Sequence, residues 1–435
     1  DIRKFNSVEL GVTFAQLKNE ILIGLRRKGQ KVRDDGGVEA IDTTIKPVSW
    51  EQFKKVKDGH VLYGAYAGTN WITGLAFKLN SSVIEQKLVT KSFFDRKERS
   101  FSSRESFAKM VGNQIKEAID TLNVDTKVSA IAISYGFPQI PKITKYGRDA
   151  IITAEHLTKS WYIKNGKGMC LGEYILKYLR SINLGFINTV YFANDTTAVA
   201  LDVSAKRSSS KDELLISLPV GFVMGTGDNG SAIFKGFKND NLVNLEIGSA
   251  SSVDSDTILD EMIKENLVPT KVPIIEYFMG GDYLLARLAV SMKFIQENKI
   301  TRNNYYQALL KYAKESKITS KLASRDISAE ELSELLHLSV KADDLFILNE
   351  VAKRILAKGA QVAGVMVASV CDLAGWGKGI YGAVPVEGTV FWQGYRFQER
   401  VKKTLKTLLP YNKLTFVPGS GTRGIATEAM INTYK

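Results

Sequence analysis

The sequence predicts an α/β protein with two related lobes. Two strand hairpins of the same kind are present, one with a Gly-Thr turn near residue 68 and one with a Gly-Thr turn near residue 226. Long helical patterns fill 280–375, and the 435 residues exceed what one ordinary core needs. Because each half has its own hairpin, we expect two lobes with a ligand site between them.

Composition and charge limit the classes of function. Apolar residues make up 44 % of the chain and charged residues 24 %, which is typical of globular proteins. The net charge of +13 is compatible with a lysine-rich surface, an anionic substrate, a membrane surface or nucleic acid. No arginine-aromatic stripe or DNA-reading motif accompanies the charge, so we expect no nucleic-acid partner. No apolar run reaches the roughly 20 residues of a membrane span.

The two cysteines, Cys170 and Cys371, allow at most one disulfide and no paired-cysteine zinc site. This usage fits a reducing compartment, and we expect a cytoplasmic protein. The three histidines show no metal-ligand spacing.

The first half of the chain alternates helices and strands. Residues 8–28 carry apolar side chains at helical spacing, and 29–49 is a polar, irregular linker. Residues 60–77 predict two strands joined by a tight turn at 67–70. A helix over 103–122 and a buried strand over 128–134 follow.

The second half repeats this order. A buried strand over 190–193 precedes a helix predicted over 198–205. Residues 219–234 form a second strand–turn–strand unit, and helices fill 280–375. A late strand over 414–417 precedes a terminal helix.

Glycine-rich turns at strand ends are candidate phosphate sites. Glycine lets the backbone approach a phosphate closely, and nearby N–H and hydroxyl groups can donate to it. Most such turns only reverse the direction of the chain. Because three of them occur in one chain, phosphate binding and simple chain reversal are equally good interpretations. No Gly-Lys-Ser/Thr loop is present. The candidates are Gly68, Thr69, Asn70, Gly225, Thr226, Gly227, Gly419, Ser420, Gly421 and Thr422.

Asn194 and Asp195 stand where a buried strand meets a helix start. One interpretation is a helix N-cap, for which Asn and Asp are preferred. The other is a general base at the carboxyl end of a strand, where ligands bind in α/β sheets. The residues themselves leave both interpretations open.

Two acids between apolar neighbours, Glu246 and Glu276, are surface acids or sugar ligands. Carboxylates suit sugars because each can accept hydrogen bonds from two hydroxyls. Thr158 and Lys159 form a plain helix end or supply a hydroxyl and an ammonium to a polar substrate.

Taken in order, these motifs resemble the hexokinase family of sugar kinases, which has the actin-like ATPase fold. The resemblance runs from about residue 8 to the end. The segments that carry it are Gly136-Phe137-Pro138, Leu157-Thr158-Lys159-Ser160-Trp161, Asn194-Asp195-Thr196, Gly225-Thr226-Gly227-Asp228-Asn229, Asn244-Leu245-Glu246-Ile247-Gly248, Ile275-Glu276-Tyr277, Val386-Glu387-Gly388-Thr389 and Gly419-Ser420-Gly421-Thr422-Arg423-Gly424.

The resemblance implies a two-lobed hexokinase-type fold with a cleft between a small and a large lobe. The small lobe would comprise 58–193 plus 421–435, and the large lobe 1–57 plus 194–420. It further implies ATP-dependent phosphorylation of a hexose 6-hydroxyl in glycolysis, with glucose as the favoured hexose.

The resemblance also assigns roles to residues. The catalytic residues would be Asp195, as the base, and Lys159. The sugar contacts would be Thr158, Lys159, Asn194, Asp195, Asn229, Glu246 and Glu276. The three glycine turns would hold ATP, and Mg²⁺ would be held through the ATP phosphates, with no side chain assigned as a metal ligand. The oligomeric state is left open.

The sequence departs from the family on the phosphate side. Ala65 stands where the family's first loop has the acid that helps hold hydrated magnesium, and Ile72 stands in place of its arginine. Gly136 replaces the serine of the sugar loop, and Pro418 replaces an Asp before the last glycine motif. The sugar-side acids are present, so the alternative function is a catalytically weakened sugar sensor or regulator.

Overall fold

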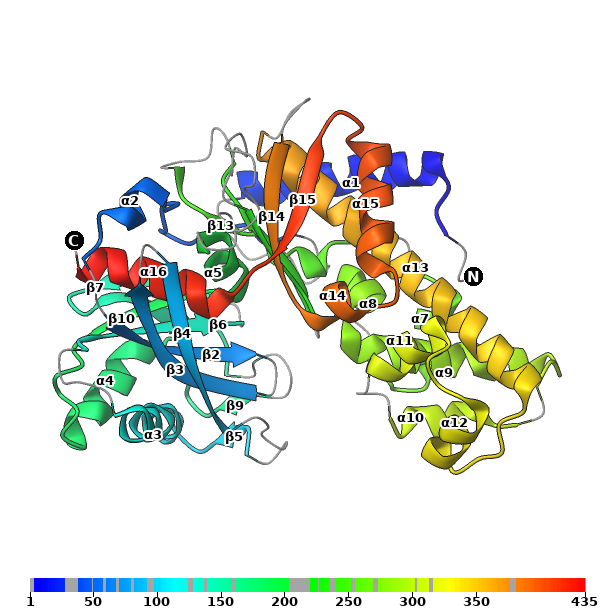
Figure 1. The fold of residues 1–435 in the computed structure, drawn as a ribbon, viewed down its shortest axis with the longest axis horizontal. Coiled ribbons are helices and arrows are strands. Elements are labelled where there is room, and N and C mark those ends of the chain that lie inside the picture. The colour runs from blue at the N-terminus through cyan, green and yellow to red at the C-terminus, as the bar shows by residue number, and fades with distance from the viewer. Residues whose placement is uncertain are drawn as a thin grey trace.

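The fold is given by a computed structural model. It describes residues 4–27, 38–48, 50–57, 60–67, 70–79, 82–91, 98–123, 128–136, 139–155, 157, 161–202, 220–225, 227–234, 240–251, 253, 255–268, 273–301, 303–312, 316–375 and 381–434. Two mixed sheets and their covering helices make up two halves that lie side by side (Figure 1).

A seven-stranded sheet forms one half, with the order β4-β3-β2-β6-β10-β8-β7. Its central strands β2, β6 and β10 are parallel, and β2 and β3 form the antiparallel hairpin predicted for 60–77. The strands are β2 His60–Ala67, β3 Asn70–Leu79, β4 Ser82–Lys91, β6 Ala130–Tyr135, β7 Gln139–Thr144, β8 Gly147–Ile152 and β10 Thr189–Ala193. A small pair, β5 Ser100–Phe101 and β9 Tyr162–Ile163, lies beside it.

Helices cover this sheet because its central strands are apolar on both faces. Strand β6 is buried at all six positions. The helices α3 and α4 pack on each other and against β3 and β8, and α16 packs against β2 and β6. The bounds are α2 Trp50–Lys54, α3 Arg104–Leu122, α4 Leu171–Ser181, α5 Asp195–Leu201 and α16 Gly421–Thr433.

A six-stranded sheet forms the other half, with the order β1-β13-β12-β11-β14-β15. The strands are β1 Ile41–Asp42, β11 Val220–Met224, β12 Asp228–Ala232, β13 Val243–Asn244, β14 Tyr381–Glu387 and β15 Lys413–Pro418. Strands β11 and β12 form the second predicted hairpin, and β14 runs parallel to β11 and β15.

The long helix α13 organises the core beside this sheet. It contacts α1, α8, α9, α11 and α15, and it runs diagonally through the right half of Figure 1. The helices are α1 Ser7–Arg26, η3 Ile247–Ser249, α7 Thr257–Lys264, α8 Ile274–Met279, α9 Gly281–Glu297, α10 Tyr305–Leu310, α11 Ser316–Ser324, α12 Ala329–Leu336, α13 Ala342–Leu373, α14 Thr389–Gln393 and α15 Phe397–Leu408. By length and composition α13 could cross a membrane, but 83 % of its most apolar window is buried in the fold.

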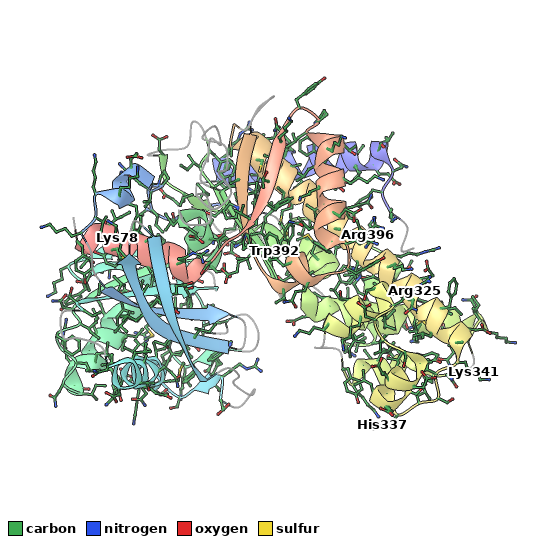
Figure 2. All side chains as sticks on the ribbon, viewed as in Figure 1. Lys78, Arg325, His337, Lys341, Trp392 and Arg396 are labelled. Carbon is green, nitrogen blue, oxygen red and sulfur yellow. The ribbon has the colours of Figure 1, made fainter. Side chains whose placement is uncertain are left out.

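Two buried contacts join distant parts of the chain. The Lys78 ammonium donates to the carbonyls of Lys54, at 3.1 Å, and Val56, and so ties the end of α2 to β3 (Figure 2). The Arg148 guanidinium of β8 pairs with Glu428 of α16 through both oxygens. The lobe boundaries at 58, 194 and 421 stay predictions.

The helix after β10 differs from its sequence prediction. It was predicted over 198–205, but α5 begins at Asp195 and ends at Leu201. The reason is that Asn194 caps it directly after the strand, so no connecting turn intervenes. Residues 203–205 of the prediction lie outside the described residues.

Candidate functional site

The end of β10 places Asn194 and Asp195 between the two sheets. Strand β10 lies inside the seven-stranded sheet, and the helix α5 that follows contacts β11 and β12 of the other sheet as well as α16. The polar pair therefore lies where elements of both halves converge. The carboxyl ends of parallel strands are favoured ligand sites in α/β folds.

Asn194 fills the capping role that the sequence left open. Its Oδ1 accepts from the Thr196 N–H at 3.1 Å and from the Thr196 hydroxyl at 2.7 Å. Asp195 is the first residue of the helix, is half-buried, and its Oδ1 accepts from the Thr196 N–H at 2.8 Å. Because Asn194 caps the helix, the Asp195 carboxylate is one position inside the cap, at the positive end of the helix dipole.

Asn244 connects the sugar-side residues that the sequence singled out. Its Nδ2 donates to Glu246 Oε1 at 2.6 Å, and its Oδ1 accepts from Asn229 Nδ2 at 2.8 Å. The Thr196 hydroxyl is 3.3 Å from the same Oδ1. Asn244 is 1 % exposed, so this chain of amides is shielded from water and fixes Asn229 and Glu246 relative to α5.

Glu246 has an unusual backbone and an unusual acidity. It lies in the left-handed region at φ 41° and ψ 42°. Loss of water contact is the main cause that raises its pKa from 4.5 to about 7. The hydrogen bond from Asn244 opposes this shift, and the negative charges of Asp195, Glu39 and Glu276 add to it. Glu246 therefore lies at the centre of a cluster of carboxyl groups that includes Asp195 and Glu276.

Glycines make room for Glu276 at this cluster. Glu276 is in the first turn of α8, and its Oε1 lies 3.4 Å from where a Cβ of Gly227 would be. The Oε2 of Glu276 lies 3.6 Å from where a Cβ of Gly248 would be. A Cβ on Gly248 would also come within 2.6 Å of the Asp228 carbonyl oxygen, so only glycine fits this position.

The turn between β11 and β12 packs against a second glycine. Gly225 N–H donates to the Gly227 carbonyl at 3.1 Å, and the Gly225 carbonyl accepts from Gly281 N–H at 2.7 Å. Gly388, at φ +134°, lies so close that a Cβ there would be 2.0 Å from the Met224 carbonyl oxygen. The motifs at 225–227 and 386–389 therefore form one surface.

The last glycine motif begins α16 beside Asp195. Gly421 N–H donates to Glu387 Oε2 at 2.7 Å, and Ser420 Oγ caps the helix by accepting from Arg423 N–H at 3.2 Å. A Cβ on Gly421 would lie 3.5 Å from the Asp195 carbonyl oxygen. The α16 loop (residues 419–424) and Asp195 thus adjoin.

An open pocket of about 230 Å³ lies beyond Gly388. Its wall includes Thr389 and two lysines of α11, Lys317 and Lys321. Trp392 Nε1 donates to the Val386 carbonyl at 2.9 Å and holds α14 against the end of β14 (Figure 2). The pocket adjoins the 386–389 motif through Thr389.

Several predicted residues are outside this description. Gly68, Thr69, Thr158, Lys159 and Thr226 lie outside the described residues, and their roles stay predictions. Asn70 is described as the first residue of β3 and pairs with Ala67. The structure does bring together Asn194, Asp195, Asn229, Glu246, Glu276, Gly225, Gly227, Gly419, Ser420, Gly421 and Thr422.

Three members of the site lie in motifs quoted from the sequence but were assigned no role there: Thr196, Asn244 and Glu387. Thr196 and Asn244 carry the hydrogen bonds between α5 and β13, and Glu387 accepts from the α16 loop. Asn244 had a usable signal, because it is a polar residue between the buried Val243 and Leu245.

Comparisons with known proteins give a family match and similar solved structures. The family model described as hexokinase matches residues 219–427. A hexokinase from Schistosoma mansoni, solved in complex with glucose, has 18 % sequence identity and a TM-score of 0.74, over 98 % of this chain and 96 % of that one. A second crystal structure of a hexokinase has 14 % identity and a TM-score of 0.72, over 99 % and 97 %. A search of curated protein sequences gives no match.

The structural similarity and the family match cover different lengths of the chain. The likeness of structures extends over nearly the whole chain and shows the two-lobed hexokinase fold. The family match covers the segment that carries Asn229, Glu246, Glu276 and the last two glycine motifs. The chain is thus similar to hexokinases in two respects: the hexokinase family model matches a little under half of its length, and its fold is that of solved hexokinases.

Proposed function

We propose that the protein transfers a phosphoryl group from ATP to the 6-hydroxyl of a hexose, with glucose as the favoured acceptor. The observation that carries this proposal is the convergence of Asp195, Glu246 and Glu276 beside the α16 loop. Acids suited to hold sugar hydroxyls therefore adjoin the glycine motif that the family resemblance assigns to the nucleotide. The solved relative with glucose bound supports a sugar as the ligand.

The sugar is held by the network of amides and acids. Glu246 and Glu276 accept from sugar hydroxyls, and Asn229 and Asn194 line the same place. Asn244 contributes as a positioning residue, because its amide fixes both Asn229 and Glu246. These side chains hold the sugar so that the 6-hydroxyl faces Asp195.

Asp195 acts as the general base. Its carboxylate accepts the proton of the 6-hydroxyl as the oxygen forms its new bond to phosphorus, an effect worth roughly 10²–10⁴-fold in rate. The carboxylate is held at the first residue of α5, with its Oδ1 bonded to the Thr196 N–H.

Some of the described residues near the glycine turns could contact a bound nucleotide. The open pocket beyond Gly388, with Lys317 and Lys321 on its wall, would receive the nucleoside. The turn at Gly225 and Gly227 would approach the phosphates. When bound, ATP supplies the phosphoryl group together with the Mg²⁺ on its phosphates.

A second function, a weakened sugar sensor or regulator, is favoured by Ala65. The acid that the family uses near the hydrated metal is missing there, whereas the sugar-side acids are present. Such a protein would bind glucose and turn over ATP slowly.

ATP turnover measured with glucose, fructose, mannose and glucosamine tests the proposal. We expect hexose-dependent turnover that falls at least about 10²-fold in Asp195→Ala, with glucose affinity retained by calorimetry. Asp120→Ala, a surface change on α3, is the matched control. Unchanged turnover in Asp195→Ala would reject the base, and glucose binding without turnover in the wild type would favour the sensor.

A further inference from the structure

The buried carboxylate of Glu85 lies against the glycine loop that begins α16. Its side chain is only 8 % exposed. Thr422 Oγ1 donates to Glu85 Oε1, and Ser420 Oγ is 3.5 Å from the same oxygen. Arg423 Nη1 is 3.8 Å from Glu85 Oε2. Two hydroxyls and a guanidinium, groups that bind phosphate well, thus converge on a carboxylate of the chain itself.

Backbone donors of the same loop are engaged as well. Ser420 N–H donates to Asp202 Oδ2 at 2.9 Å, and Gly421 N–H donates to Glu387 Oε2 at 2.7 Å. Arg423 also forms hydrogen bonds of 3.1 Å from Nε to both Asp202 oxygens. The N–H groups that a phosphate would use at a helix N-terminus are therefore paired with carboxylates.

The charge balance around the loop is negative. Glu85, Asp202 and Glu387 bring three negative charges when ionised, and Arg423 brings one positive charge. Burial weakens screening by water, so a phosphate entering here would meet repulsion from the nearest carboxylate. The loop in this form is poorly suited to a polyphosphate.

Glu85 is held firmly in this position. It pairs with Ala76 in the antiparallel ladder of β3 and β4, and α16 packs against β4. Burial and, secondarily, the negative charge of Glu85 raise the pKa of Tyr63 on β2, which places that phenol close by. The contact with the loop therefore belongs to the packed sheet rather than to a surface side chain.

We infer that Glu85 is a specificity-determining residue that takes the place of a nucleotide phosphate in the α16 loop and selects against phosphate-bearing ligands. The inference rests on the proposed function in one respect, namely that a nucleotide is the ligand of this loop. A nucleotide that binds with its phosphates at the loop must displace the Glu85 carboxylate from Thr422 and Arg423. Glu85 thereby lowers the affinity for ATP but not for adenosine.

The test compares Glu85→Gln with the wild type by calorimetry, using adenosine, AMP, ADP and ATP without added Mg²⁺. The amide has the size of the carboxylate and still accepts from Thr422, but it carries no charge. We expect Glu85→Gln to bind adenosine with the same affinity as the wild type. Its affinity for the nucleotides should exceed that of the wild type by a factor that grows with the number of phosphates and reaches about tenfold for ATP. Glu117→Gln, an exposed change on α3, is the control and should change nothing.

The wild type alone provides a second test that does not depend on the variant folding. Its affinity should stay level or fall from adenosine to ATP, and a rise of about tenfold along this series would overturn the inference. Equal ATP affinity in wild type and Glu85→Gln, or an equal gain for adenosine, would also overturn it. If neither form binds any of the four nucleotides, the proposed function fails and this inference with it.

Discussion

At the scale of single residues, the acid cluster links the chemistry of the site to the stability of the fold. Glu246 is neutral in both the folded and the unfolded chain at low pH. As the pH rises from 4.5 towards 7, the unfolded chain loses this proton while the folded chain retains it, because burial raises the folded pKa to about 7. The contribution of Glu246 to stability is therefore full below pH 4.5 and is lost as the pH rises through 7.

We predict that this loss is measurable against Glu246→Gln, which cannot ionise. The unfolding free energy of the wild type relative to the variant should fall by about 1–3 kcal/mol between pH 4.5 and pH 7.5. Urea denaturation of both proteins across this range gives the difference. A difference that stays constant with pH would show that burial does not raise the pKa of Glu246.

The same acids should determine sugar affinity. Charge-assisted hydrogen bonds contribute roughly 1.5–3 kcal/mol each. Glu246→Gln or Glu276→Gln should therefore weaken glucose binding by about tenfold or more in calorimetry above about pH 8, where Glu246 is ionised. Glu334→Gln, an exposed change on α12, is the control. Wild-type affinity in both site variants would exclude these acids as sugar ligands.

The sequence predicted individual residues unevenly. Glu246 and Glu276 stood out because they are acids between apolar neighbours, and Asp195 because it follows a buried strand. Glu85 gave no signal, because its partners Ser420 and Thr422 are 335 and 337 positions away along the chain. Contacts of this kind arise from the packing of β4 on α16, which local patterns do not contain.

At the scale of elements, the close crossing of α5 and α16 positions both the base and the last glycine motif. A Cβ on Gly424 would lie 1.7 Å from the Ala198 carbonyl oxygen, so the two helices touch backbone to backbone there. Gly421 lies one turn earlier on α16, next to Asp195. Separation of the two helices would thus move the loop away from the base.

We predict that Gly424→Ala lowers the unfolding free energy by about 1–3 kcal/mol, as overpacking of a tight contact does. Gly11→Ala is the matched control, since this helical glycine of α1 has no atom within 4 Å of its Cβ position. There alanine should raise stability by about 0.5–1 kcal/mol through helix propensity. If the urea midpoints of both variants move in the same direction, α5 and α16 do not touch closely at Gly424.

The sequence predicted elements best where apolar periodicity was strong. The hairpins at 60–77 and 219–234, helix α3 and strand β15 were predicted within a few residues of their bounds. The start of α5 was misplaced because the capping role of Asn194 was left open. Strands β7 and β8 were not predicted, because residues of β7 such as Ile140 and Ile143 are exposed and interrupt the alternation of a half-buried strand.

At the scale of the whole molecule, the acids of the site come from different elements and a sugar would bridge them. Asp195 belongs to α5, Glu246 follows β13, and Glu276 belongs to α8. A ligand that binds only the folded form stabilises it by mass action. Glucose at 100 times its Kd should therefore raise the unfolding free energy by about 2.7 kcal/mol.

We predict that the same glucose concentration raises the unfolding free energy of Glu276→Gln less than that of the wild type, by about 1 kcal/mol or more. The reason is that the variant has a higher Kd for glucose. Thermal unfolding with and without glucose measures both values. An equal rise in the two proteins would place the sugar away from Glu276.

The most direct measurement identifies the product formed from glucose and ATP. Incubation with Mg²⁺, followed by phosphorus NMR and mass spectrometry, shows where the phosphoryl group goes. The proposed function predicts glucose 6-phosphate as the product, and this product should not form with Asp195→Ala. Free phosphate without a sugar phosphate, or a sugar phosphate that forms equally well in Asp195→Ala, would contradict it.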